Sequence, residues 1–135
     1  MKTAVIYWSG TGNTEAMAQA VAQGAGAELF TVSAFSGDIA QYDAIAFGCP
    51  AMGAENLEES EFEPFFSAAE SKLSGKKVAL FGSYGWGDGE WMRSWEERIA
   101  AANAVLVSGE GVIANEFPSD EALVKCRELG KALVS

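Results

Sequence analysis

The stretch TAVIYWSGTGNTEAMAQAVAQGAG, residues 3–26, contains a complete strand, loop and helix. Its first five residues form a continuous apolar run, which is typical of a strand buried on both faces. A loop of glycines and hydroxyl-bearing residues follows at Ser9–Thr14, and apolar residues then recur at helical spacing until Gly24 and Gly26 end the pattern. A buried strand that leads into a helix in this way predicts an α/β fold built on a parallel sheet.

The same alternation continues to the end of the chain. Further β-rich runs predict strands at Glu28–Val32, Asp43–Phe47, Lys77–Phe81 and Ala104–Val107, with the last resuming at Val112–Ile113. Apolar residues at helical spacing predict helices over Phe62–Leu73, Trp91–Ile99 and Ala122–Leu133, whereas residues 33–41 have room for one short helical turn. The alternation indicates parallel strands with helices on both faces of the sheet.

Composition limits the class of protein. The 135 residues fit a single domain spanning 1–135, and 9 Lys and Arg against 19 Asp and Glu give a formal charge of −10. A chain this acidic is expected to repel nucleic acid and to bind basic proteins. It has no histidine, and its two cysteines are too few for a zinc or iron–sulfur site. No apolar run is long enough to cross a membrane and no signal-peptide pattern is present, so we expect a cytoplasmic location.

The first loop, Ser9-Gly10-Thr11-Gly12-Asn13-Thr14, has the composition of an anion-binding site. Backbone N–H groups, hydroxyls and the start of a helix all supply partial positive charge. The loop is not a Walker loop, because no Lys or Arg occurs between Thr3 and Ser71. It is not a dinucleotide fingerprint either, because Glu15 replaces the third glycine. Two interpretations stay open: a phosphate site made of neutral donors, or a glycine-rich turn capped by its own hydroxyls.

Two other loops are predicted to lie at the same edge of the sheet, because both follow parallel strands. They are Gly48–Glu55, which contains Met52, and Gly82–Gly89, which contains Trp86. An indole and a thioether at loop tips are costly to expose and could cover the two faces of a flat aromatic ligand. Alternatively, Trp86 folds onto its own loop and Met52 fills the core. A phosphate loop beside an aromatic plate indicates a phosphorylated planar cofactor, a description that fits flavin mononucleotide (FMN).

Four segments carry a resemblance to a known family: residues 7–15 (YWSGTGNTE), 48–53 (GCPAMG), 63–66 (EPFF) and 81–87 (FGSYGWG). The chain resembles the flavodoxins, specifically the short-chain bacterial type, over essentially its whole length. The resemblance implies a doubly wound sheet of five parallel strands in the order 2-1-3-4-5, with non-covalent FMN as the cofactor. Residues 104–116 have no room for the insertion that long-chain flavodoxins carry in the fifth strand.

The resemblance also implies the site residues. Trp86 and Met52 would cover the two faces of the flavin ring, and Glu55 would accept a hydrogen bond from its N3–H. Gly53 and Ala54 would tune the redox potential, in a type II′ turn with Gly53 at positive φ. The full set of cofactor-binding residues implied is Ser9, Gly10, Thr11, Gly12, Asn13, Thr14, Ala51, Met52, Gly53, Ala54, Glu55, Ser83, Tyr84, Gly85, Trp86, Gly87 and Asn115. No catalytic residue and no metal ligand is implied.

The function implied is that of a low-potential one-electron carrier, not an enzyme, which shuttles mainly between the semiquinone and hydroquinone forms of FMN. We expect the acidic residues near the flavin to lower its second potential. These residues are Glu55, Glu58, Glu59, Glu61 and Glu63. They would also steer basic-patch redox proteins, both reductases and low-potential acceptor enzymes, to the flavin edge of a monomer.

Three alternatives share parts of this pattern. An NAD(P)H-dependent flavin or quinone reductase would need basic residues for the dinucleotide phosphates, and only Arg93 and Arg98 follow the third loop. A flavodoxin-like activator of a ribonucleotide reductase would share the fold and the cofactor but serve one dedicated partner. A signalling receiver would need acidic residues directly after the first strand, where the sequence has Trp8, Ser9 and Gly10.

Overall fold

The computed structural model describes residues 1–135 and contains one sheet. Its strands are β1 (Thr3–Tyr7), β2 (Glu28–Thr31), β3 (Ala44–Gly48), β4 (Lys77–Tyr84), β5 (Val105–Leu106) and β6 (Val112–Asn115). Their order is β2-β1-β3-β4-β5, β6 also pairs with β4, and every pairing is parallel. The predicted doubly wound α/β fold with the order 2-1-3-4-5 is confirmed.

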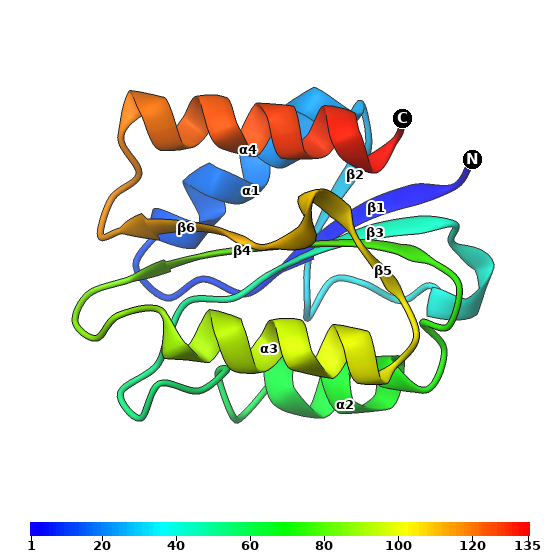
Figure 1. The fold of residues 1–135 in the computed structure, drawn as a ribbon, viewed down its shortest axis with the longest axis horizontal. Coiled ribbons are helices and arrows are strands. Elements are labelled where there is room, and N and C mark those ends of the chain that lie inside the picture. Colours follow the sequence, from blue (N-terminus) through cyan, green and yellow to red (C-terminus); the bar gives the residue numbers. More distant parts are fainter.

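Helices cover both faces of the sheet, as Figure 1 shows. α1 (Asn13–Ala25) and α4 (Asp120–Leu133) lie on one face, and α2 (Phe62–Glu70) and α3 (Glu90–Ala101) lie on the other. Residues 39–41 form a single 3₁₀ turn, in the segment that the sequence predicts to hold one short helical turn. α4 is the longest helix with 14 residues, and no helix has the length and apolarity needed to cross a bilayer.

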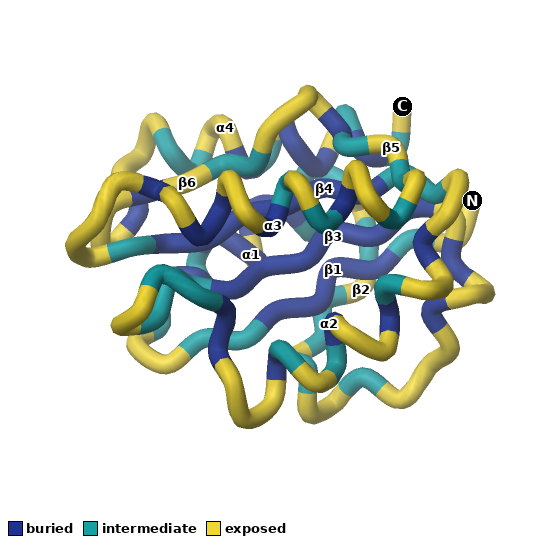
Figure 2. Tube along the Cα trace, turned by 60° about the horizontal axis from the view of Figure 1, so that its bottom comes forward, coloured by how far each residue is buried: buried dark blue, intermediate teal, exposed yellow.

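The central strands β1, β3 and β4 are buried, which Figure 2 shows as dark blue tube through the middle of the molecule. Neighbouring residues of a strand point to opposite faces, so Val5 enters the core beneath α1 and α4 whereas Ile6 enters the core beneath α2 and α3. Burial on both faces explains the continuous apolar runs in the sequence. The α2–α3 core is aromatic: the rings of Phe62 and Phe66 pack edge-on against Trp95, with centroids 5.5 and 5.6 Å away.

The α1–α4 layer depends on two glycines at close helix contacts. A Cβ at Gly24 would lie 1.9 Å from the carbonyl oxygen of Arg127, and a Cβ at Gly130 would lie 2.1 Å from that of Val21. Gly24 is therefore an interior contact point of α1, which corrects the prediction that it ends the helix. Gly26 does end it, in the left-handed conformation (φ 62°) that a C-terminal cap requires.

The edge of the sheet beside β4 confirms the predicted break in the fifth strand, but the lengths of its strands differ from the prediction. The fifth strand is split into β5 and β6 by a 3₁₀ turn at Val107–Gly109, in which Ser108 has a φ of 65°. β4 continues to Tyr84, three residues beyond the predicted end, because β6 pairs with its last residues in the register Phe81↔Val112 to Tyr84↔Asn115. The short strands β5 and β6 thus pair one after the other with the long strand β4, and the pairing with β6 extends β4 to the carboxyl end of the sheet, where the loops lie.

Candidate functional site

The carboxyl ends of β1, β3 and β4 lie at the same edge of the sheet, to the left in Figure 1. The loops that leave these strands border a cavity of about 340 Å³, which is within the size range of ligand pockets. Its lining comprises Trp8, Gly10, Thr11, Asn13, Pro50, Ala51, Met52, Ser83, Tyr84, Gly85 and Glu116. The structure therefore brings together the three loops that the sequence predicts to meet.

The first of these loops is shaped from within by a serine. The Ser9 hydroxyl oxygen accepts hydrogen bonds from the N–H groups of Gly12 (3.1 Å) and Glu15 (3.3 Å). Gly12 has a φ of 95°, a conformation that glycine adopts without strain, and the chain turns there directly into α1. With its two lone pairs engaged, Ser9 retains one hydroxyl proton to donate to a ligand.

Several donors of the same loop have no acceptor in the protein. They are the backbone N–H groups of Ser9, Gly10, Thr11 and Thr14. α1 begins at this point with Gly12 as its N-cap, a residue without a side chain to accept these bonds, and its first turn contains one acidic residue, Glu15. Unpaired N–H groups at the start of a helix can bind an anion such as phosphate without a basic side chain.

Two buried hydroxyls fix the first loop to the third. Thr14 and Ser83 are only 1% and 4% exposed, and their hydroxyl oxygens lie 2.9 Å apart. The N–H of Ser83 also donates to Thr14 Oγ1 (3.3 Å). Ser83 lies within β4 rather than in the loop where the sequence analysis places it, so these bonds tie the start of α1 to a rigid strand.

The second loop reverses direction in a turn from Met52 to Glu55. The Glu55 N–H donates to the Met52 carbonyl oxygen (2.9 Å), and the Met52 N–H donates to the Asn56 carbonyl oxygen (2.9 Å). The predicted type II′ turn is wrong for this conformation, because Gly53 does not have a positive φ. The left-handed residue is instead Glu55 (φ 54°), at the position where the chain leaves the turn.

The Glu55 carboxylate explains this conformation, because it is held by the third loop. Its Oε2 accepts a hydrogen bond from the N–H of Trp91 (3.0 Å) in the first turn of α3. Its Oε1 lies against Gly87 so closely that a Cβ there would be 1.9 Å away. The residue that the resemblance assigns to the flavin N3–H therefore caps α3 here and links the second loop to the third.

The third loop presents an exposed indole. Trp86 is 66% exposed and does not line the cavity, whereas its neighbours Tyr84 and Gly85 do. Asn115, the last residue of β6, donates from Nδ2 to the carbonyl oxygens of Tyr84 (3.3 Å) and Gly85 (3.1 Å). The structure thus places Asn115 as a support for the backbone next to Trp86.

These features coincide with a known family. A family model described as Flavodoxin matches residues 5–130. The chain is 48% identical to the flavodoxin of Clostridium beijerinckii, over 97% of this chain and 98% of that one. It is also 48% identical to the flavodoxin of Megasphaera elsdenii, over 95% of both chains. This chain belongs to the flavodoxin family.

Solved structures of flavodoxins agree with this membership. The solution structure of two-electron reduced Megasphaera elsdenii flavodoxin matches over 98% of both chains, with a TM-score of 0.80 and 43% identity. Oxidised flavodoxin 1 from Bacillus cereus matches over 99% of this chain and 97% of that one, with a TM-score of 0.82 and 29% identity. As a flavodoxin, the chain binds FMN and acts as a low-potential electron carrier for redox proteins, not as an enzyme.

The residues of this flavodoxin fit FMN. The unpaired N–H groups of the first loop suit a phosphate, and the cavity beside them is bordered by the apolar surfaces of Ala51 and Met52. Bound there, FMN supplies the one-electron redox chemistry. The first loop would offer neutral donors to the phosphate and the second an apolar wall to the ring, and Glu55 links the second loop to α3.

The acidic segment after the second loop has two kinds of carboxylate. Glu58 is buried, 6% exposed, and caps the start of α2: its Oε1 accepts from the N–H groups of Glu61 (2.8 Å) and Phe62 (2.9 Å). Burial acts to raise the pKa of Glu58, but these bonds and those from the hydroxyl and N–H of Ser60 outweigh it and lower the pKa to about 2. Glu58 therefore caps α2 and is ionised at neutral pH, and its expected effect on the flavin potential stays a prediction.

The negative charge of Glu63 is paired with a basic side chain. It forms a bidentate pair with Arg98 at 2.8 Å, and Arg98 also binds Glu70 at 2.8 Å. The Arg98 side-chain hydrogen bond is the main cause of the lowered pKa of Glu63. Of the expected acidic run, Glu63 alone is paired with a basic side chain, and Arg98 is not free to bind a dinucleotide. The members without a basic partner are Glu55, Glu58, Glu59 and Glu61.

Three cavity residues have no role in the sequence prediction, Trp8, Pro50 and Glu116. Trp8 directly follows β1, and its Nε1 donates to Oε1 of Glu61 (3.1 Å). The sequence did contain a signal for Trp8: a tryptophan lies there between a buried strand and a glycine-rich loop, and such a ring is seldom left without a packing partner. Glu116 follows β6, whose position became clear only from its pairing with β4.

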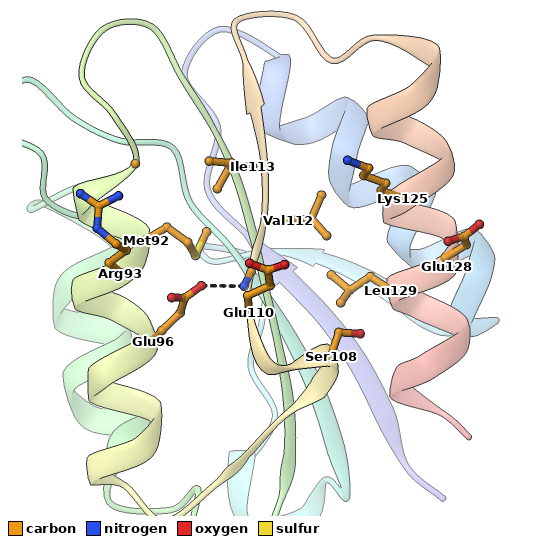
Figure 3. A pocket seen from close by; sticks show the side chains of 12 residues that line it. Met92, Arg93, Glu96, Ser108, Glu110, Val112, Ile113, Lys125, Glu128 and Leu129 are labelled. Carbon is orange, nitrogen blue, oxygen red and sulfur yellow. Dashed lines mark hydrogen bonds between the residues drawn. The ribbon is translucent and has the colours of Figure 1, made fainter.

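A second cavity, about 500 Å³, lies beside β6 between α3 and α4 (Figure 3). Figure 3 shows Met92, Arg93 and Glu96 on the α3 side, and Lys125, Glu128 and Leu129 on the α4 side. Glu96 Oε2 accepts a hydrogen bond from the N–H of Gly111 (2.7 Å), the dashed line in Figure 3. The backbone donor of Gly111, which directly precedes the outermost strand β6, is therefore already paired. A charged side chain that blocks an edge in this way discourages pairing with another strand, so we assign the cavity no ligand.

Proposed function

We propose that this flavodoxin holds the FMN phosphate in the Ser9–Thr14 loop and the flavin ring between Met52 and Trp86. The observation that carries the assignment is the set of four N–H groups without an acceptor, in a loop without a cation. It favours the phosphate site over a self-capped turn, because a self-capped turn would leave no such donors. The partly buried Met52 lines the cavity, and the exposed Trp86 is free to cover the opposite side of a ring.

We infer further that the protein works on the lower of its two one-electron potentials. Three carboxylates at the flavin edge, Glu55, Asp88 and Glu90, have oxygens within 4.8 Å of one another, and a single cation, Arg93, pairs with Asp88 (3.0 Å). Such a concentration of negative charge opposes the gain of a second electron and lowers the second potential. Glu59 and Glu61 are exposed at the same edge and add to the effect.

The same carboxylates support basic redox proteins as partners. Exposed charge of one sign around a site steers oppositely charged surfaces toward it, in a salt-dependent way. The monomer is the form that leaves this edge free for transient docking. A cytoplasmic location is supported by two unpaired cysteines, Cys49 and Cys126, which lie in different cores on opposite faces of the sheet and cannot form a disulfide.

A potentiometric reduction of the FMN-loaded protein tests this function. We expect two separate one-electron steps, the second at the lower potential, and no reduction by NADPH alone. Reduction of a basic haem protein should slow as ionic strength rises. A single two-electron step driven by NADPH would overturn the proposal, and so would a rate that does not depend on salt.

A further inference from the structure

Trp8 lies where the first loop and the acidic segment meet. Its indole ring packs on Gly10 so closely that a Cβ there would be 3.1 Å from the ring atom Cη2. Its Nε1 donates to Oε1 of Glu61, 3.1 Å away and 53 residues further along the chain. Its backbone N–H donates to the Gly48 carbonyl oxygen (3.0 Å), which fixes the residue to β3. Trp8 is therefore held at the ring, at the ring nitrogen and at the backbone.

The indole also separates two cavities. One is the cofactor cavity of about 340 Å³, and the other, of about 440 Å³, lies between the first loop and the end of β2. Trp8, Gly10 and Thr11 line both.

Ser9 and the Thr14–Ser83 pair hold the two ends of the loop, but its tip at Gly10 and Thr11 has few other contacts. Gly10 and Thr11 are exposed, and its internal hydrogen bonds are few, at 3.1 to 3.4 Å between donor and acceptor. Several N–H groups bind one anion well only if their directions are already fixed, because otherwise binding must order the loop. The indole is the only large side chain that packs on this loop at Gly10.

We propose that Trp8 is the positioning residue that keeps the phosphate loop in its anion-binding shape, and that its bond to Glu61 makes the site select phosphorylated over unphosphorylated flavin. This rests on the proposed phosphate site in the first loop. Glu61 acts as a hydrogen-bond acceptor, not as a charge, since its negative charge by itself would repel a phosphate. The acceptor and the charge can be separated, because Gln retains an acceptor oxygen and has no charge.

The test is the ratio of affinities for FMN and riboflavin, which differ only by the phosphate, measured by quenching of flavin fluorescence. We expect Trp8→Phe, which retains a ring but loses the N–H, and Glu61→Ala to lower the preference for FMN about threefold to tenfold each. The double variant should lower it no further, because both changes remove one bond. Glu61→Gln should retain the preference or raise it.

Glu59→Ala is the matched control, because it removes an exposed carboxylate two residues away that bonds only to Asn56. We expect it to leave the ratio unchanged. Unchanged riboflavin binding in each variant would show that the fold is intact. The proposal would be overturned if Trp8→Phe and Glu61→Ala weakened the binding of FMN and of riboflavin equally. It would also be overturned if the effects of the two changes on the affinity ratio added up in the double variant.

Inorganic phosphate separates this proposal from the one on which it rests. In the unmodified protein, phosphate should compete with FMN and not with riboflavin if the first loop binds the phosphate group. Failure of that competition would overturn the phosphate site itself. Competition as expected, with an unchanged ratio in Trp8→Phe and Glu61→Ala, would overturn only the role of Trp8.

Discussion

The sheet has an amino edge, where its parallel strands begin, and a carboxyl edge, where they end. These two edges are built in opposite ways. At the amino edge, polar groups are paired within the protein: Lys76 Nζ donates to the carbonyl oxygens of Ala40 (3.1 Å) and Tyr42 (2.7 Å), and the Lys2 N–H donates to Asp43 (2.7 Å). At the carboxyl edge, four N–H groups of one loop have no acceptor, and a tryptophan is 66% exposed. The first edge completes the fold, while the second leaves polar and aromatic groups free for a ligand.

Charge follows the same division. Four of the nine basic residues lie at the amino edge, namely Lys2, Lys72, Lys76 and Lys77, whereas the carboxyl-edge loops after β1 and β3 have none. The comparison teaches that an exposed or unpaired group means different things at the two edges. We expect changes at the amino edge to alter stability alone, and changes at the carboxyl edge to divide between stability and redox function according to burial.

The largest effect is expected for Gly82→Ala, where the carboxyl edge is most tightly packed. A Cβ at Gly82 would lie 2.2 Å from the backbone carbonyl oxygen of Cys49, so the ends of β3 and β4 would have to separate. We expect a loss of about 3 kcal/mol in the free energy of unfolding, measured in urea at a fixed FMN concentration. Gly85→Ala is the control for stability, because a Cβ there meets no atom within 4 Å. Equal stability of the two variants would contradict the prediction.

Glu58→Gln should come next, because it removes a buried helix cap. The pKa of Glu58 in the folded protein, about 2, lies below the ordinary value of a glutamate, 4.5, so Glu58 stabilises the fold fully above about pH 5 and loses this effect as the pH falls toward 2. The shift corresponds to about 3 kcal/mol at most, and Gln retains one acceptor, so we expect a loss of about 2 kcal/mol at pH 7. The difference from wild type should shrink in acid.

The exposed neighbour provides the control for Glu58. Glu59→Gln should leave the free energy of unfolding within about 0.5 kcal/mol of wild type at every pH. A loss as large as that of Glu58→Gln, or a loss for Glu58→Gln that does not depend on pH, would contradict the role of Glu58 as a cap. The pair thus tests whether burial, rather than position along the acidic segment, decides what a carboxylate does.

Much of this molecule follows from the sequence, because the deciding patterns are local. The strands β1, β3 and β4 were predictable from their apolar runs, and the three loops from the parallel order. What escaped prediction depends on partners distant in the chain: β4 extends to Tyr84 because β6 pairs with it, and Glu58 is buried because α2 begins over it. The Gly53 turn was also missed, because the anchor of Glu55 on α3 decides which residue is left-handed.

A smaller effect is expected at the amino edge from Lys76→Met. This change removes two charge-assisted hydrogen bonds to backbone carbonyls and retains the apolar stem, so we expect a loss of about 1 kcal/mol in the free energy of unfolding. Lys72→Met removes an ion pair with Asp38 in which both side chains are 49% exposed, and it should have almost no effect. Both variants should bind FMN with wild-type affinity. A shift in FMN affinity for either would mean that the two edges are coupled.

The smallest effect is the one that acts on function alone. Glu59→Gln with Glu90→Gln removes two exposed charges from the carboxyl edge, and each should raise the second one-electron potential by about 10–20 mV at distances of roughly 10 Å in a water-like dielectric. Glu28→Gln with Glu97→Gln makes the same change in net charge at exposed positions, at the start of β2 and on α3. Because water and salt screen distant charges, that pair should shift the potential far less. Equal shifts from both pairs would show that the potential responds to total charge, and that the acidic carboxyl edge has no special part in setting it.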